Sequence, residues 1–188
     1  MTESEAYLFQ ARGDLAAFWL LEGAFVRQPA PRFQEPDLEC QALHYLQMAT
    51  EKLGKAAYLV KHTISGRRSH GDWYFRQVWG SMQTYPLQAE LGLTRNGLTE
   101  MLARCDSVRT RISQLQPEVA HLANPAHVRH RYDSLNVVYP WENPPGDWHA
   151  PGHESFGLLV KGGLDTSAVI DFVMLVDALI THFSVVFP

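Results

Sequence analysis

Residues 41–60 read QALHYLQMATEKLGKAAYLV, and this stretch decides the fold. Apolar or small side chains recur in it at spacings of three and four, which places them on one side of an α-helix and predicts that this side is buried. They are Leu43, Leu46, Thr50, Leu53, Ala57 and Val60. Another side carries His44, Gln47, Glu51 and Lys55, which we interpret as a solvated or interhelical face. An exposed Glu–Lys pair stabilises a helix by only about 0.2–0.5 kcal/mol, so packing must hold this helix.

Three further segments predict helices. Residues 4–28 carry apolar or small residues at helical spacing, and so do the segment from Arg95 to Leu115 and the apolar run 168–186. Residues 67–93 mix arginines with Trp73, Tyr74, Phe75 and Trp79, which fits either a short helix whose aromatic side chains fill the end of a bundle or a nucleic-acid face. We therefore predict an all-α fold, an up-and-down bundle of four to five helices with a long ordered loop before the C-terminal helix.

The amino-acid composition limits the classes of protein to which the chain can belong. The chain has 188 residues, of which 46% are hydrophobic and 19% charged, and its net charge is -4. These values are typical of one folded domain, here residues 1–188. The mild negative charge argues against a generic polyanion binder, although a local basic face is compatible with it.

The cysteines and the chain ends suggest a cytoplasmic protein without a membrane span. Cys40 and Cys105 lie in helical stretches beside apolar neighbours, and we expect buried, reduced thiols. The N-terminus MTESEAYLFQ is acidic where a secretory signal would be basic. The apolar run 168–186 contains Asp171, Asp177 and His182, which favours a bundle helix that is buried on several sides, either centrally or partly against a second subunit.

Residues 123–156 form a Pro-rich segment with many His and aromatic residues, and we expect an ordered loop packed on the bundle. Five of the nine histidines lie between His121 and His153, but their spacing matches no established metal-ligand pattern, and a Pro-Gly separates His149 from His153. No nucleophile elbow or Gly-rich phosphate loop occurs either. The sequence predicts neither a metal site nor a cofactor.

The first stretch resembles a known family. The segment ALHYLQMATEKLGKAAYL, with Glu51, Lys52 and Lys55, is similar to the amphipathic helix of HEPN domains. The following Ser69-His70-Gly71-Asp72 looks like the next loop of that family, and Val138-Tyr139-Pro140-Trp141 is similar to the Tyr-Pro ending of some members. The resemblance implies an all-α bundle, often a homodimer, found in ribonuclease toxins, in RNA-processing systems and in partners of nucleotidyltransferases.

Catalytic HEPN members use an Arg followed four to six residues later by His, and no Arg of this chain has a His at that separation. We therefore favour a non-catalytic HEPN-like module that binds a protein partner or a nucleotide or RNA. Candidate ligand-binding residues are Arg104, Arg111, Arg131, Tyr132, Tyr139 and Trp141. A divergent, metal-independent ribonuclease is the alternative, with His127, Arg129 and His130 of the segment HVRHRY as candidate catalytic residues. A structural helical protein is the third hypothesis.

Overall fold

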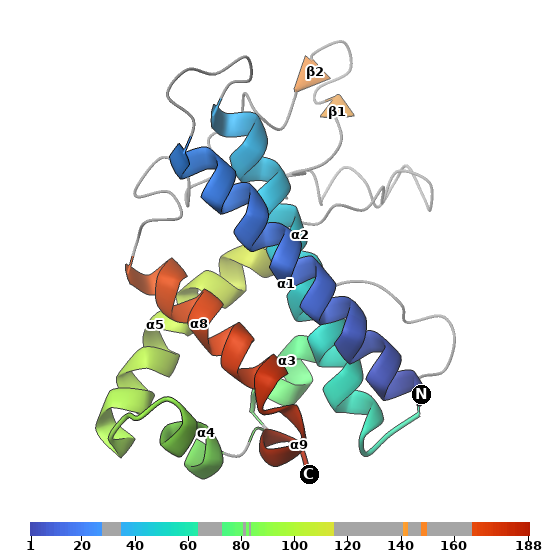
Figure 1. The fold of residues 1–188 in the computed structure, drawn as a ribbon, viewed down its shortest axis with the longest axis vertical. Helices are drawn as coiled ribbons and strands as arrows, with labels where there is room; N and C mark the ends of the chain where they lie inside the picture. Colours follow the sequence, from blue (N-terminus) through green and yellow to red (C-terminus); the bar gives the residue numbers. More distant parts are fainter. Residues whose placement is uncertain are drawn as a thin grey trace.

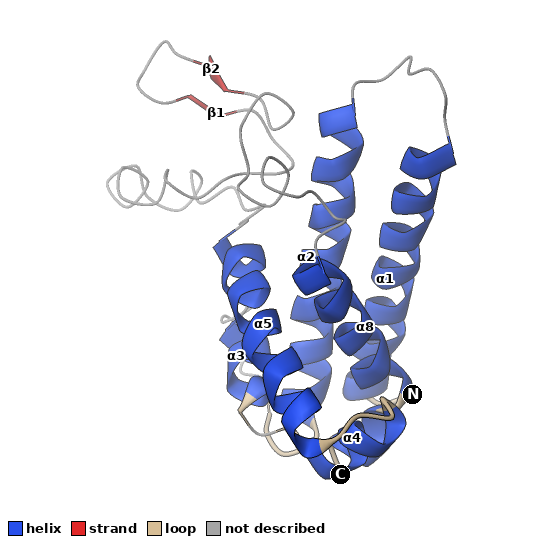
Figure 2. Cartoon of the chain, turned by 90° about the vertical axis from the view of Figure 1, so that its left-hand side faces the viewer, coloured by secondary structure: helices blue, strands red, loops and turns tan. Residues whose placement is uncertain are grey.

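A computed structural model of the chain describes residues 1–27, 35–63, 73–80, 82, 84–114, 141–142, 148–149 and 167–188. Within these residues the fold is all-α, as the sequence predicts, with one two-residue strand pair. Four long helices alternate in direction along the chain, and short helices close one end of the bundle (Figures 1 and 2).

The helices α1 (Glu3–Arg27) and α2 (Glu35–Leu59) form an antiparallel pair that lies side by side over most of its length (Figure 2). The start of α1 is a capping box, because the Thr2 hydroxyl accepts a hydrogen bond from the Glu5 backbone N–H at 3.2 Å and the Glu5 carboxylate accepts one from the Thr2 backbone N–H at 2.6 Å. Further along, Ser4 donates from its hydroxyl to the Ala56 carbonyl at 2.8 Å and ties α1 to the end of α2.

Helix α2 is the centre of the bundle. Leu43, Leu46 and Leu53 are fully buried, which confirms the predicted buried side, but Val60 is 39% exposed and the expectation for it was wrong. The other side of α2 is buried as well, because neighbouring helices cover it. Helix α3 (Trp73–Trp79) packs so closely on α2 that no side chain separates its backbone from Gly54. Tyr74 and Phe75 of α3 are buried, which confirms for these two side chains that the aromatic segment fills the core.

The second half of the bundle contains α4 (Thr84–Glu90), α5 (Arg95–Gln114), α8 (Ser167–Thr181) and α9 (Phe183–Val186). Gly92 ends α4 in a left-handed conformation with φ of 63°, which glycine adopts without strain. The Thr94 hydroxyl accepts a hydrogen bond from the Gly97 N–H at 3.1 Å and caps α5. The expected single C-terminal helix is interrupted at His182, and the short α9 that follows packs against α4 and α8 (Figure 1).

Helices α5 and α8 cross, and their buried side chains join those of α1, α2 and α3 in one core (Figure 1). The face of α8 that packs inward carries Phe172, Val173, Val176 and Leu179. Cys105 of α5 is a free, buried thiol, as expected, and burial raises its pKa to about 12. The Cys40 side chain lies outside the described part.

The region predicted as a long ordered loop is described only at β1 (Trp141–Glu142) and β2 (Trp148–His149). These strands pair in antiparallel register, Trp141 with His149 and Glu142 with Trp148. The rest of residues 123–156 lies outside the described part, so the prediction for it stays a prediction. Among the described helices, none combines the length and the apolar character that a membrane crossing requires.

Candidate functional site

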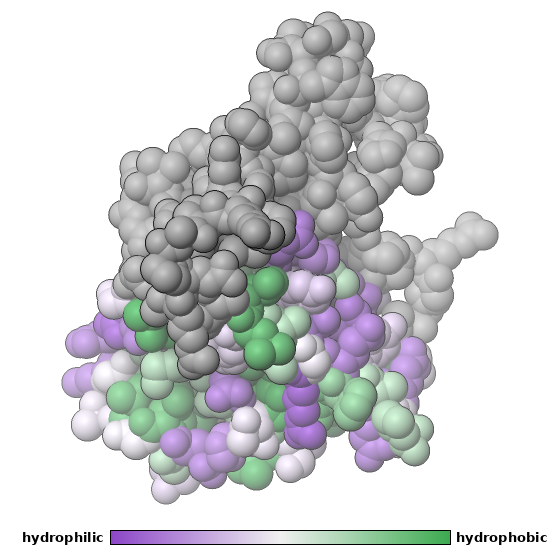
Figure 3. Space-filling model, turned by 45° about the horizontal axis from the view of Figure 1, so that its top comes forward, coloured by the Kyte–Doolittle hydropathy of each residue, from purple (hydrophilic) through white to green (hydrophobic). Residues whose placement is uncertain are grey.

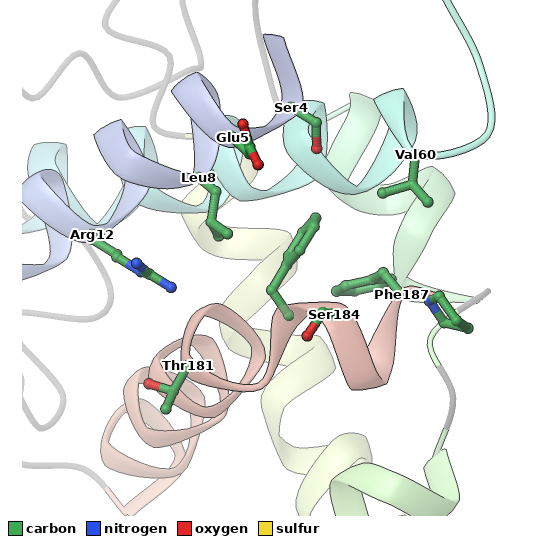
Figure 4. A pocket seen from close by; sticks show the side chains of 10 residues that line it. Ser4, Glu5, Leu8, Arg12, Val60, Thr181, Ser184 and Phe187 are labelled. Carbon is green, nitrogen blue, oxygen red and sulfur yellow. The ribbon is translucent and has the colours of Figure 1, made fainter. Parts of the chain in front are cut away.

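A groove opens where the beginning of α1, the end of α2 and the C-terminal helices meet (Figure 4). Its volume is about 470 Å³, within the range of roughly 300–1,000 Å³ that is typical of small-molecule sites. Its floor is apolar: Leu8 and Phe183 pack against the core, and Phe187 is buried in it. Val60 borders the groove, which accounts for the exposure of this residue.

The polar groups of the groove are unevenly distributed. Arg12 and Thr181 lie at one end, and Val60 and Phe187 lie at the other (Figure 4). Glu5 is also part of the lining, but the hydrogen bond that its carboxylate accepts from Thr2 in the capping box lowers its pKa. The negative charge of Glu5 is therefore stabilised by the first turn of α1. In the described part of the chain, the Arg12 side chain forms neither a hydrogen bond nor an ion pair.

A second feature is the side of α1 that faces away from the bundle, which we call the α1 outer face and define as Phe9, Gly13, Ala16 and Leu20. Phe9 is 72% exposed and Leu20 is 75% exposed, although both are large and apolar. A Cβ added at Gly13 would meet nothing within 4 Å. The opposite side of the same helix, with Ala11, Leu15 and Phe18, is buried in the core. In one view of the molecule, Figure 3 shows hydrophobic residues among hydrophilic ones at the surface of the described part.

A third feature is a row of buried polar residues along α2. Lys55 donates to the Glu51 carboxylate at 2.5 Å, and both side chains are less than 10% exposed. The Lys55 ammonium also lies 5.5 Å from the centre of the Tyr7 ring in α1. Lys52 faces Asp14 of α1 at 3.7 Å. Two cations and two anions balance one another, so this row links α1 to α2 and carries no surplus charge for a ligand.

His44 and Gln47 continue this row toward the start of α2. In the described part, neither the His44 Nδ1 atom nor the Gln47 Oε1 atom has a hydrogen-bond partner, and both atoms are buried. Burial lowers the pKa of His44, and the positive charge of Lys52 acts in the same direction. His44 is therefore a neutral imidazole near pH 7. The sequence predicts that this stripe of His44, Gln47, Glu51 and Lys55 is solvated or interhelical. Gln47, Glu51 and Lys55 are buried, so the solvated interpretation was wrong for these three residues.

Arg104 and Arg111 are the two α5 arginines that the sequence proposes for ligand binding, and Arg104 has a structural partner. Arg104 donates to one carboxylate oxygen of Asp171 from Nε at 2.9 Å and from Nη2 at 2.7 Å. This contact joins α5 to α8 and raises the pKa of Arg104. Arg109 pairs with Asp106 at 2.8 Å and lies 5.7 Å from the centre of the Trp79 ring. The basic side of α5 is thus partly used for packing.

The remaining candidates are not brought together by any described contact. Arg111 lies on α5 with its side chain outside the described part, and Trp141 lies in β1 with its side chain likewise outside it. The other candidates lie entirely outside the described residues; they are His127, Arg129, His130, Arg131, Tyr132 and Tyr139. Among the residues that the structure describes, no three His, Cys, Asp or Glu side chains gather as a metal ion would require.

In comparisons with known proteins, no family model matches the chain, and neither a curated protein nor a solved structure is significantly similar to it. The sequence did not predict the groove. The residues of the α1 outer face are among those whose helical spacing predicts a helix over residues 4–28, but the spacing does not show that this side of the helix is exposed. The spacing of Glu5, Leu8 and Arg12 shows that one side of α1 carries all three, but the other wall of the groove comes from residues more than 160 positions away. No local sequence pattern indicates that these two distant segments lie next to each other.

Proposed function

We propose that the protein is a non-catalytic, HEPN-like helical module that binds protein, and that the partner of its α1 outer face is a second copy of the chain. The observation that carries this proposal is the exposure of Phe9 and Leu20 on a helix whose other side is fully used by the core. An exposed apolar side of a helix, here with Phe9 and Leu20 about three turns apart on it, is typical of an interaction surface.

The order of residues on this face favours a second copy over an unrelated partner. Phe9 and Leu20 are equally distant along the helix from its Asp14–Leu15 midpoint, and so are Gly13 and Ala16. A two-fold axis through that midpoint would place Phe9 against the partner's Leu20 and Gly13 against the partner's Ala16. Large residues then meet large ones at the ends, while small residues at the centre let the two backbones approach. Such self-complementarity is what an isologous dimer interface requires.

The α1 outer face supplies part of the apolar area of a standard dimer interface. The exposed parts of Phe9 and Leu20 together offer roughly 220–370 Å² of apolar surface per protomer, if a large side chain presents roughly 150–250 Å² in full. A specific interface buries about 800 Å² per partner, of which somewhat more than half is apolar. The rest of the interface area can come from residues on either side of the α1 outer face, because α1 has 25 residues and is about 37 Å long.

Sedimentation equilibrium of the purified chain between 1 and 100 μM tests the proposal. We expect a monomer–dimer equilibrium in the wild type, and we expect Phe9→Ser and Leu20→Ser to weaken it at least tenfold. Two-fold symmetry makes each substitution remove a buried apolar side chain twice, and burying one such side chain contributes about 1.5–3 kcal/mol. Both positions are exposed, so neither substitution should lower the thermal unfolding midpoint of the monomer.

Tyr85→Ser is the matched control, since Tyr85 is 81% exposed but lies on α4. It should leave the dimerisation constant unchanged. A wild type that stays monomeric at 100 μM contradicts the proposal. A dimer that Tyr85→Ser weakens as much as Leu20→Ser contradicts the assignment to α1.

A further inference from the structure

The groove between α1, α2 and α9 has the properties of a small-molecule site, independently of the α1 outer face. Concave, mostly apolar sites with a few converging polar groups are where proteins bind small ligands. This groove has an apolar floor made by Leu8, Phe183 and Phe187. Arg12 and the hydroxyl of Thr181 lie together at one end of it (Figure 4).

The charges of the groove select the kind of ligand. The Arg12 guanidinium has five N–H donors, and none of them is engaged by another described residue. An anionic group is the complement of such a side chain, and it would gain a second donor from Thr181. Glu5 lies seven residues before Arg12, about 10 Å along the helix axis. Among the described residues that line the groove, Arg12 is the one cationic side chain, so the groove offers a cationic partner to one negative charge and not to a second.

We propose that this groove binds a small monoanion with an apolar body, of the medium-chain fatty carboxylate class. Its carboxylate contacts Arg12 and Thr181, and its hydrocarbon chain lies over Leu8, Phe183 and Phe187. A dicarboxylate or a nucleotide fits less well, because each brings additional charge or polarity to the apolar floor and to the end at Glu5.

A titration of the isotope-labelled protein with sodium octanoate, followed by amide chemical shifts below the micelle concentration, tests this proposal. We expect saturable shifts confined to the first three turns of α1, the end of α2, and residues 181–188. Arg12→Gln should weaken octanoate binding about tenfold or more, because it removes a charge-assisted contact, and Arg12→Lys should restore part of the loss. Arg12 is exposed, so neither substitution should prevent folding, and the amide spectrum of each variant checks this directly.

Three arms make the outcome decisive. Arg95→Gln removes an exposed charge from α5 and should leave octanoate affinity unchanged. 1-Octanol, which has the same chain without the charge, should bind more weakly than octanoate and equally well to wild type and Arg12→Gln. Adenosine monophosphate should compete poorly. Octanoate affinity that is insensitive to Arg12→Gln, octanol binding as tight as octanoate binding, or shifts centred on Phe9 and Leu20 would each overturn the proposal while leaving the test of dimerisation unaffected.

Discussion

Gly54 of α2 lies directly against the backbone of Phe75 in α3. A Cβ added at Gly54 would come within 2.4 Å of the Phe75 backbone nitrogen and within 2.7 Å of its Cα. Real Cβ atoms do not approach backbone so closely, so the two helices pack at this distance only because position 54 has no side chain. The contact fixes α3 against the centre of α2 and brings the Phe75 ring into the core, 6.3 Å from the ring centre of Phe172 in α8.

Gly54→Ala should destabilise the protein by about 1–3 kcal/mol, because the added methyl group must push α3 away. The gain in helix propensity of up to about 1 kcal/mol offsets part of this cost. Urea unfolding measures the net effect. Gly13→Ala is the matched control, measured at a protein concentration where the chain is monomeric because Gly13 belongs to the α1 outer face. It adds the same methyl group in open space on α1 and should stabilise the monomer by about 0.5–1 kcal/mol. Equal effects of the two substitutions would show that the α2–α3 contact is not tight in solution.

The buried pair of Glu51 and Lys55 should be strongly coupled. Removing one partner leaves the other charge in the protein interior, so Glu51→Leu and Lys55→Met should each cost about 3–5 kcal/mol. The double variant should cost much less than the sum of the two, since it leaves neither charge behind. Lys61→Met, at an exposed position just beyond α2, should change the free energy of unfolding by less than about 0.5 kcal/mol. Additive effects of Glu51→Leu and Lys55→Met would contradict a direct pair.

Substitutions of Arg104 and Asp171 test whether Arg104 has a structural role or a ligand-binding role. If Arg104 serves to join α5 to α8, then Arg104→Gln and Asp171→Asn should both lower the thermal unfolding midpoint slightly, and combining them should lower it no further. Binding of a fluorescent single-stranded RNA, measured by anisotropy, should be the same for Arg104→Gln and wild type. A variant with an unchanged midpoint and weakened RNA binding would instead support the sequence-based ligand hypothesis.

Periodicity predicted the helices of this chain well, because each long helix carries a continuous apolar side that its own residues define. Leu43, Leu46 and Leu53 mark such a side on α2, and the structure buries them. The same pattern does not tell how many other sides are covered. Glu51 and Lys55 look like surface residues in the sequence, and only the packing of neighbouring helices around α2 makes them interior. Helix α1 presents the converse case, since Phe9 and Leu20 are as apolar as the residues that the core uses.

The candidate sites could not be predicted from the sequence for a related reason. A groove between Arg12 and Thr181 depends on where the last helix turns, and that turn occurs at His182 inside a run that reads as one continuous helix. The arginines of α5 suggested an anion site through their charge alone, but charge pattern does not reveal that Asp171, 67 residues away, contacts Arg104. The groove and the Arg104–Asp171 ion pair both depend on residues far apart in the sequence, so a short segment of sequence cannot predict them.

Asp14 gives the protein a pH dependence whose sign follows from its surroundings. Burial raises the pKa of its carboxyl above the ordinary value of 3.8, and the opposing attraction of Lys52 is smaller. The folded protein then holds the Asp14 proton more tightly than the unfolded chain does. Stability contributed by this group is therefore greatest at acid pH and is lost as pH rises from about 3.8 through the raised pKa.

Urea unfolding of wild type and Asp14→Asn at pH 4, 5, 6 and 7 isolates this contribution, because the other titrating groups cancel in the difference. The free energy of unfolding of the wild type, relative to that of Asp14→Asn, should be highest at pH 4 and should fall toward pH 7. It should stop changing once the carboxyl is ionised in both the folded and the unfolded protein. A difference that grows in favour of the wild type as pH rises would mean that the ion pair with Lys52, at 3.7 Å, outweighs the cost of burying Asp14.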